Sequence, residues 1–219
     1  MPTNPASRTD RKTRSASKKA FLNIPYDKEF EPLYLAFIAG LAGFGLIPQA
    51  VLQIPESQRR LDRILSLIRS CKISFHDLSR VELDLKRPHT PRFNMPFELG
   101  LAVAWQRVGD HSHHWYVFEA KAHRLQKSLS DLNGTDPNVH YRHARGVLQQ
   151  LANVLVRQRH RPTVQELEAI LRELQRAAAE IKNELRTKSL FTARGFEDLV
   201  LAAGEIARSH VTSLRPKGR

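Results

Sequence analysis

Apolar and polar positions alternate in two rhythms between about residue 19 and residue 158. Short apolar runs predict buried strands at residues 20–24, 46–52, 72–76 and 115–119. Stretches with helical spacing of apolar residues follow these runs and predict helices at about residues 30–44, 61–68, 94–107 and 143–157. This regular alternation of strand and helix is typical of a layered α/β fold.

Successive strands separated by helices are expected to run parallel, because a parallel pair needs a crossover connection between its strands. We therefore predict an α/β domain over residues 19–158, with an open parallel sheet in a flavodoxin- or Rossmann-like three-layer arrangement. Glycines at the end of the first helix, including Gly45, are interpreted as packing and capping residues. A phosphate-binding glycine loop would instead stand between a strand and the start of a helix.

Residues 159–219 follow another pattern, which predicts a helical extension with a basic C-terminus. Apolar residues recur at spacings of three and four between residues 163 and 185. Thr163 and Glu166 have the spacing of a capping box at the start of this helix. The apolar seam is expected to pack against the α/β domain or the next helix. The alternative is a homo-oligomer formed through the 163–185 helix.

Charge is distributed unevenly along the 219 residues, whose formal net charge is +13. Residues 1–20 hold six basic residues against one acidic residue and are rich in Ser, Thr and Pro. We expect residues 1–18 to form a disordered basic tail. Such a tail predicts weak, non-specific and salt-dependent binding of nucleic acid.

The composition is that of an ordinary globular protein, with 41% apolar and 26% charged residues. A single cysteine, Cys71, excludes an intramolecular disulfide and fits a reducing compartment. No apolar stretch is long enough to span a membrane, and the N-terminus lacks the apolar segment of a secretion signal. We therefore expect a cytoplasmic protein without membrane association.

The carboxyl edge of the predicted sheet is where a ligand is expected, since open parallel sheets bind ligands beyond the ends of their strands. Three segments meet there: the loop at residues 23–27, residues 77–79, and the start of the helix that holds Glu98. Asn94 is the expected N-cap of that helix, and Pro96 fits its first turn. Glu98 then lies about one turn inside, where the helix dipole is expected to keep its carboxylate ionised.

Other chemistries lack their motifs in this chain. There is no P-loop and no G-x-S-x-G nucleophile elbow. The ten histidines lack the spacing of a metal site, so neither a metal nor another cofactor is expected. Carboxylate chemistry remains: one ionised carboxylate can stabilise the oxocarbenium-like centre that forms when an N-glycosidic bond breaks. Asp77 and Ser79 are then candidates to bind ribose hydroxyls. Arg59, Arg60 and Arg92 are candidates to bind phosphates.

Three segments resemble the nucleoside 2-deoxyribosyltransferase-like group, whose relatives include TIR-type domains that cleave NAD. They are residues 21–27 (FLNIPYD), 73–80 (ISFHDLSR) and 94–102 (NMPFELGLA). Residues 21–157 also read much like an uncharacterised bacterial branch that contains a segment of the type found at residues 130–137 (SDLNGTDP).

The resemblance implies roles for individual residues. Glu98 would be the nucleophile, since it stands in the Phe-Glu-Leu-Gly-x-Ala segment of the family. Asp77 would position the ribose. The loop after the first strand would frame the base, and the resemblance together with the edge geometry makes a larger set of residues candidates for substrate binding: Asn23, Pro25, Tyr26, Asp27, Asp77, Ser79, Arg92 and Asn94.

Two functions follow as expectations. The first is cleavage or transfer of an N-glycosidic bond in a nucleotide or nucleoside, with NAD hydrolysis as one form of it. The second is a nucleotide-binding, TIR-like signalling or interaction module without turnover, associated with nucleic acid through its basic tails.

Overall fold

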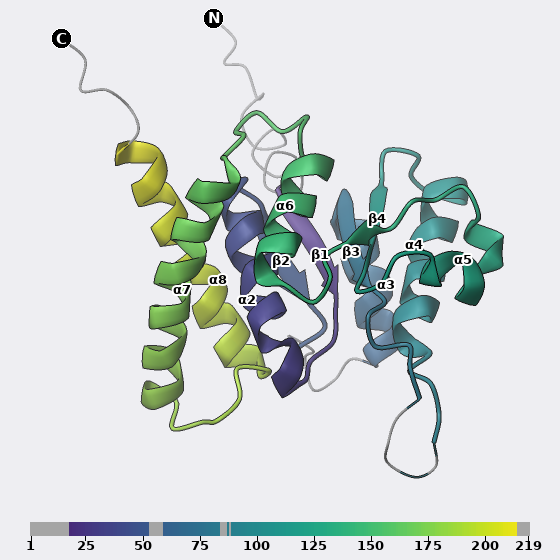
Figure 1. Cartoon of the computed structure of the whole chain (residues 1–219), viewed down its shortest axis with the longest axis horizontal. Helices are drawn as coiled ribbons and strands as arrows, with labels where there is room; N and C mark the ends of the chain where they lie inside the picture. The colour runs from purple at the N-terminus through teal and green to yellow at the C-terminus, as the bar shows by residue number, and fades with distance from the viewer. Residues whose placement is uncertain (1–17, 53–58, 84–86, 88, 214–219) are drawn as a thin grey trace, which may run out of the picture.

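Five parallel strands form one open sheet in the order β2-β1-β3-β4-β5 in a computed structural model of the chain (Figure 1). The structure describes residues 18–52, 59–83, 87 and 89–213. The strands are β1 (Lys19–Asn23), β2 (Ile47–Ala50), β3 (Ile73–Asp77), β4 (His114–Glu119) and β5 (Asn138–Val139). The predicted open parallel α/β sheet is confirmed, and its strand order is that of flavodoxin-like doubly wound sheets.

Strand β5 was not predicted from the sequence. It is only two residues long. Asn138 pairs with Phe118 of β4, and Val139 pairs with Glu119 of β4. Both residues of β5 are half-buried, and so short a segment has no apolar periodicity. The pairing with β4 therefore depends on the tertiary structure.

Helices cover both faces of the sheet (Figure 1). One face carries α2 (Glu31–Gly43), α6 (Ala144–Val154), α7 (Val164–Glu184) and α8 (Ala193–Ser213). The other face carries α3 (Arg60–Ser70), α4 (Asn94–Val108) and α5 (Arg124–Ser128). Short 3-10 turns lie at η1 (Lys28–Phe30) and η2 (Ser130–Leu132).

Helix α2 is the centre of the larger core. Every residue from 33 to 43 is buried, because the helix lies between the sheet and the helices α6, α7 and α8. A Cβ atom at Gly40 would lie 2.5 Å from Leu151 Cδ1, and one at Gly43 would lie 2.4 Å from Leu167 Cδ2. Gly45 has a φ of 73° just after the helix. The interpretation of these glycines as packing and capping residues is confirmed.

The C-terminal extension consists of two antiparallel helices, α7 and α8, which pack on α2 (Figure 1). The predicted capping box is present, because Glu166 N donates to Thr163 Oγ1 at 3.3 Å and Thr163 N donates to Glu166 Oε2 at 2.6 Å. The apolar seam of α7, including Leu167 and Leu174, is buried within the chain. A homo-oligomer through this helix stays a prediction, as do the basic tails, which lie outside the described residues.

Candidate active site

Glu98 lies at the carboxyl edge of the sheet, in the second turn of α4. Its neighbours Phe93 and Phe97 are exposed, whereas the Glu98 side chain is turned inward and only 2% exposed. Its Oε2 atom is buried without a hydrogen-bond partner. The nearest positive charge is Arg60 at the start of α3, with Nη2 at 4.0 Å from Glu98 Oε1 and a side chain that is 55% exposed. Glu98 is therefore a buried acid with one distant, solvated partner.

Burial raises the pKa of Glu98 to about 7, and the positive charge of Arg60 only partly offsets this. The helix dipole was expected to keep this carboxylate ionised, and the raised pKa shows that burial acts in the opposite direction at this position. The loss of hydration outweighs the field of the helix end, because the side chain points into the protein instead of toward solvent. A carboxyl group with a pKa near 7 can exchange a proton at neutral pH.

The prediction that Asn94 caps α4 was wrong. Phe93 occupies the N-cap position without a side-chain hydrogen bond, and Asn94 is the exposed first residue of the helix. The helix begins one residue earlier than expected, since Phe97 N already donates to Phe93 O at 3.0 Å. A contact between Asn94 and substrate stays a prediction.

Asn23 connects β1 to both β3 and α4. Its Nδ2 atom donates to the Met95 carbonyl at 3.0 Å and contacts His76 Nδ1 at 3.0 Å. Asn23 is buried, so these bonds replace those that it would make with water. They hold the first turn of α4, and with it Glu98, against the end of β1.

A chain of buried hydrogen bonds continues from Asn23 along β3. His76 Nε2 lies 2.9 Å from Ser74 Oγ, which lies 3.0 Å from His113 Nε2, and His113 Nδ1 lies 2.8 Å from the Cys71 carbonyl. That carbonyl can only accept, so His113 donates from Nδ1, Ser74 donates to His113 Nε2, and His76 donates to Ser74. The donor and the acceptor of each hydrogen bond in this chain are therefore fixed. Burial lowers the pKa of His76 to about 3 and also lowers the pKa of His113.

Asp27 is engaged by two arginines. Arg80 Nη2 lies 2.9 Å from its Oδ1 atom, and Arg92 Nη1 lies 3.3 Å from its Oδ2 atom. Asp27 Oδ1 also accepts from Phe30 N at 3.0 Å, which caps the turn η1. The predicted binding residues Asp27 and Arg92 thus lie together and form an ion pair with each other.

Tyr26 and Pro25 lie in the loop between β1 and η1. Pro25 is buried and Tyr26 half-buried. The Tyr26 hydroxyl donates to the Leu22 carbonyl at 3.4 Å. Burial raises the pKa of Tyr26, and the charge of Glu98 raises it further, whereas Arg60 lowers it. Tyr26, Glu98 and Arg60 therefore share one electrostatic environment. Together with Asn23 we call them the Glu98 site.

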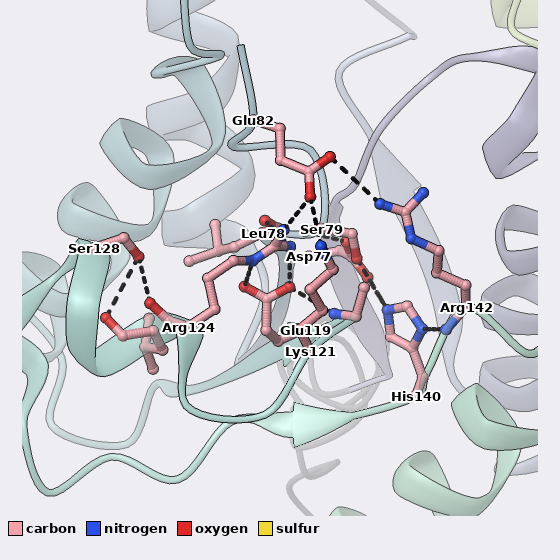
Figure 2. Close-up of polar contacts among 12 residues, drawn as sticks. Asp77, Leu78, Ser79, Glu82, Glu119, Lys121, Arg124, Ser128, His140 and Arg142 are labelled. Carbon is pink, nitrogen blue, oxygen red and sulfur yellow. Dashed lines mark hydrogen bonds and ion pairs between the residues drawn. The ribbon is translucent and has the colours of Figure 1, made fainter.

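Asp77 and Ser79 lie at the end of β3 in a second group of polar residues (Figure 2). Asp77 Oδ1 accepts from Ser79 N at 2.8 Å, and Asp77 Oδ2 lies 2.9 Å from His140 Nε2. Ser79 Oγ lies 3.0 Å from the same His140 nitrogen. All three residues are buried. The two predicted ribose-binding residues thus face His140, which was not among the predicted site residues.

Ser79, His140 and Asp77 do not form a catalytic triad. In a triad the acid holds one imidazole nitrogen and the serine faces the other. Here both Ser79 and Asp77 face Nε2, while Nδ1 accepts from Arg142 N at 3.0 Å. The ring proton is therefore on Nε2, and His140 cannot accept a proton from Ser79 at that atom.

Glu119 and Arg124 complete this group and were not predicted either. Glu119 is 1% exposed, and its two oxygens accept from Arg124, with Nε at 2.8 Å from Oε2. Arg124 also donates to Glu82 at 2.8 Å, as Figure 2 shows. We call Asp77, Ser79, Glu119, Arg124 and His140 the Asp77 cluster. The signal in the sequence was weak, because an acid ending an apolar strand and a basic residue five positions later are common.

The backbone after His140 is strained. Tyr141 and Arg142 have φ angles of 51° and 60°, in the left-handed region that favours glycine. A Cβ atom at Gly146 would lie 2.4 Å from the His140 carbonyl oxygen, so only glycine allows this approach to α6. The strained turn places the Arg142 amide against His140 Nδ1 and orients the ring toward Asp77.

The predicted site residues thus divide into separate groups. Within the described part of the chain, no hydrogen bond or ion pair joins Glu98 to Asp77 or Ser79. A shallow cavity of about 270 Å³ lies between α2 and α7, beside Glu31 and Lys182, and none of the predicted site residues lines it.

In residues 18–52, 59–83, 87 and 89–213, no three His, Cys, Asp or Glu side chains are grouped so that they could hold a metal ion. None of the helices in the same ranges is long and apolar enough to cross a membrane.

No protein-family model, curated protein or solved structure matches this chain. What is shown is a generic α/β fold with a five-stranded parallel sheet, and the resemblance to nucleoside 2-deoxyribosyltransferase-like proteins stays a prediction. A functional assignment must come from the chemistry of the site.

Proposed function

We propose that the protein cleaves or transfers the N-glycosidic bond of a nucleotide or nucleoside, with Glu98 as nucleophile or as stabiliser of the oxocarbenium-like sugar. The observation that carries the proposal is the state of Glu98: a buried carboxyl group with one unpartnered oxygen and a pKa of about 7. Perturbed acids of this kind concentrate at catalytic sites.

The proposed reaction needs few groups. The bond between C1′ of the sugar and the ring nitrogen of the base breaks, and its electron pair stays on that nitrogen. Glu98 either forms a bond to C1′, which breaks again when water or a second base adds there, or compensates the positive charge of C1′ until the acceptor adds; the acceptor's proton is released to solvent. A base that is already cationic, such as the nicotinamide of NAD, leaves as a neutral molecule and needs no general acid.

The remaining candidates act as binding residues in this proposal. Asn23 holds the first turn of α4 and the charge of Glu98 acts on Tyr26, so both are candidates to contact the sugar or base, as are Pro25 and Asn94. Arg60 is largely exposed beside Glu98 and could bind a phosphate. Asp77, Ser79 and the Asp27–Arg92 pair could take part only by exchanging some of the hydrogen bonds that they make within the protein.

A second function, nucleotide binding without turnover, is favoured by one observation. Glu98, Asp77 and Ser79 are all buried, and the latter two already have partners in the protein. A closed arrangement of this kind suits a signalling or interaction module, which would need its ligand bound but not cleaved. Association with nucleic acid through the basic tails would belong to this alternative.

The test is release of free base by the full-length chain from NAD and a panel of nucleosides and nucleotides, followed by chromatography. We expect the variant Glu98→Gln to lose about 100-fold or more of the activity, as expected when a group that stabilises transition-state charge is removed. Glu180→Gln, an exposed acid on α7, is the matched control and should keep it.

The pH profile adds a second readout. A nucleophile or charge stabiliser must be ionised, so activity should rise with pH through an apparent pKa of about 7. Equal turnover by Glu98→Gln would refute the proposed role of this residue. Nucleotide binding without any base released over hours would support the binding module instead.

A further inference from the structure

Tyr26 lies where the two halves of the core meet. Its ring packs against apolar residues on the α2 face of the sheet and also against those on the α3–α4 face. A side chain can contact both faces only where the sheet ends, and Tyr26 follows the last residue of β1 by three positions. Tyr26 therefore closes the carboxyl end of β1, on the side where Glu98 lies.

The back of Tyr26 is held by the C-terminal extension. Phe191, in the connection between α7 and α8, has its ring centroid 6.1 Å from that of Tyr26 and 5.1 Å from that of Tyr34. Tyr34 in α2 lies 6.3 Å from Tyr26 and is fully buried. Leu190, the residue before Phe191, is also fully buried. The connection is thus anchored in the core at this point.

Figure 1 shows how the extension reaches this place. The chain leaves α7, runs below the helices in this view and enters α8 beside the first turn of α2. Helix α8 then packs along α2. The connection is the part of the extension that contacts the loop holding Tyr26.

Asn23 at the end of β1 bonds the Met95 carbonyl in the turn before Glu98, and Tyr26 packs on the apolar cluster that includes Ala102, one turn after Glu98. The charge of Glu98 acts on the Tyr26 hydroxyl, and Arg60 acts on both groups. Glu98 is almost completely buried although it is in the second turn of a helix with exposed phenylalanines on its outer side. The carboxyl group is therefore covered at the sheet edge, where Tyr26 is a large side chain packed on the same apolar cluster as Ala102 of α4.

We propose that the connection between α7 and α8 forms part of the candidate active site: Phe191 holds Tyr26 in place, and Tyr26 keeps water away from Glu98. That this site is catalytic rests on the proposed function, whereas the shielding of Glu98 does not depend on it. Tyr26 and Phe191 are positioning residues in this arrangement. The helical extension, for which the sequence suggested only packing or oligomerisation, then has a role in the chemistry of the site.

The consequence is a link between Phe191 and the proton affinity of Glu98. With Phe191 reduced to alanine, Tyr26 loses the ring behind it and can move away from the sheet edge. Water then reaches Glu98, and its pKa falls from about 7 toward the value of 4.5 usual for a solvated glutamate. A residue on one face of the sheet thus changes the titration of an acid on the other.

The test is a pH titration of the full-length chain with ¹³C-labelled glutamate carboxyl groups, read by NMR, with Glu98→Gln used to assign the signal. Phe191→Ala should lower the pKa of Glu98 by about one unit or more. Tyr26→Ala should reproduce this fall, whereas Tyr26→Phe, which keeps the ring, should cause a much smaller change. Leu201→Ala, at an exposed position of α8, is the matched control.

Each outcome of this titration either supports or overturns the inference. An unchanged Glu98 pKa in folded Phe191→Ala would overturn the inference. If that variant does not fold, Phe191→Leu and Tyr26→Ala provide the same reading, and an unchanged pKa in both overturns it equally. A pKa that falls in a protein releasing no base supports the inference and refutes the proposed function. Base release with an unchanged pKa in the variants does the reverse.

Discussion

Two buried glutamates at the same edge of the sheet have opposite surroundings. Glu119, at the end of β4, is 1% exposed and accepts two hydrogen bonds from Arg124, whose side chain is itself only 16% exposed. Glu98, in α4, is 2% exposed, has an unpartnered oxygen, and faces an arginine that is 4.0 Å away and mostly in solvent. Burial alone therefore does not identify a functional acid; the missing partner does.

The same contrast extends to the surrounding residues. In the Asp77 cluster, acids, arginine and histidine satisfy one another, and they join β3, β4 and β5 (Figure 2). In the Glu98 site, Asn23 and Tyr26 hold β1 and α4 in place, but neither forms a hydrogen bond that would compensate the burial of the Glu98 carboxyl group. We interpret the first as the part that makes the edge rigid and the second as the part that is available for chemistry.

The strongest test of this contrast removes the partner of Glu119. Arg124→Ala leaves a buried carboxylate without its counter-ion, and we expect it to lower the free energy of unfolding by about 3–5 kcal/mol. Urea denaturation at pH 7 measures this. Lys121→Ala, which removes an exposed partner of Glu82, should cost less than about 1 kcal/mol. A loss of similar size for both variants would contradict the assignment of Arg124 as a structural partner.

The next test concerns the pH dependence of stability. The pKa of Glu98 is raised from 4.5 in the unfolded chain to about 7 in the folded protein, so between these values the folded state binds more protons. Its contribution to stability is therefore fully present below pH 4.5 and is lost as the pH rises through 7. The shift corresponds to roughly 3 kcal/mol at most.

Glu98→Gln should remove this contribution, because glutamine does not titrate. Relative to the natural chain, the variant should gain stability as the pH is raised from 4.5 to 8, measured by urea denaturation at a series of pH values. Glu180→Gln is again the control and should show no such gain. A difference between Glu98→Gln and the natural chain that is constant with pH would mean that Glu98 keeps an ordinary pKa.

The smallest expected effect separates two buried serines: Ser74, in the hydrogen-bond chain that continues from Asn23, and Ser79, in the Asp77 cluster. Ser74→Ala leaves the facing nitrogens of His76 and His113 without a partner, at a cost of about 2 kcal/mol. Ser79→Ala should cost about 1 kcal/mol, since His140 keeps both Asp77 and the Arg142 amide. Thermal or urea unfolding compares the two. A greater loss for Ser79→Ala would mean that the hydroxyl holds the Asp77 cluster together.

Much of the fold could be predicted from the sequence. The four longer strands, the helices between them, the glycine that ends α2 and the capping box of α7 all leave local signals within a few residues. The carboxyl edge of the sheet was also predictable, because parallel strand order follows from the alternation of elements. Glu98 was found through its position at that edge.

The state of the site was not predictable in the same way. His140 and Asp77 are 63 positions apart, and Asn23 and Met95 are 72 apart, so no local pattern announces their contacts. The same holds for Tyr26 and Phe191, which come from opposite ends of the chain. The expected cap at Asn94 failed because the first backbone bond of α4 runs from Phe97 N to Phe93 O, and the distant Asn23 holds the Met95 carbonyl in the first turn.

The order of strands and helices, and the presence of an acid at the sheet edge, were thus determined by the sequence through periodicity and local hydrogen bonding. Only the tertiary structure decided that Glu119 is paired and Glu98 is not. The physical reason is that desolvation and ion pairing depend on which distant side chains surround a carboxyl group. The raised pKa of Glu98 is therefore a property of the folded protein and not of the segment that contains it.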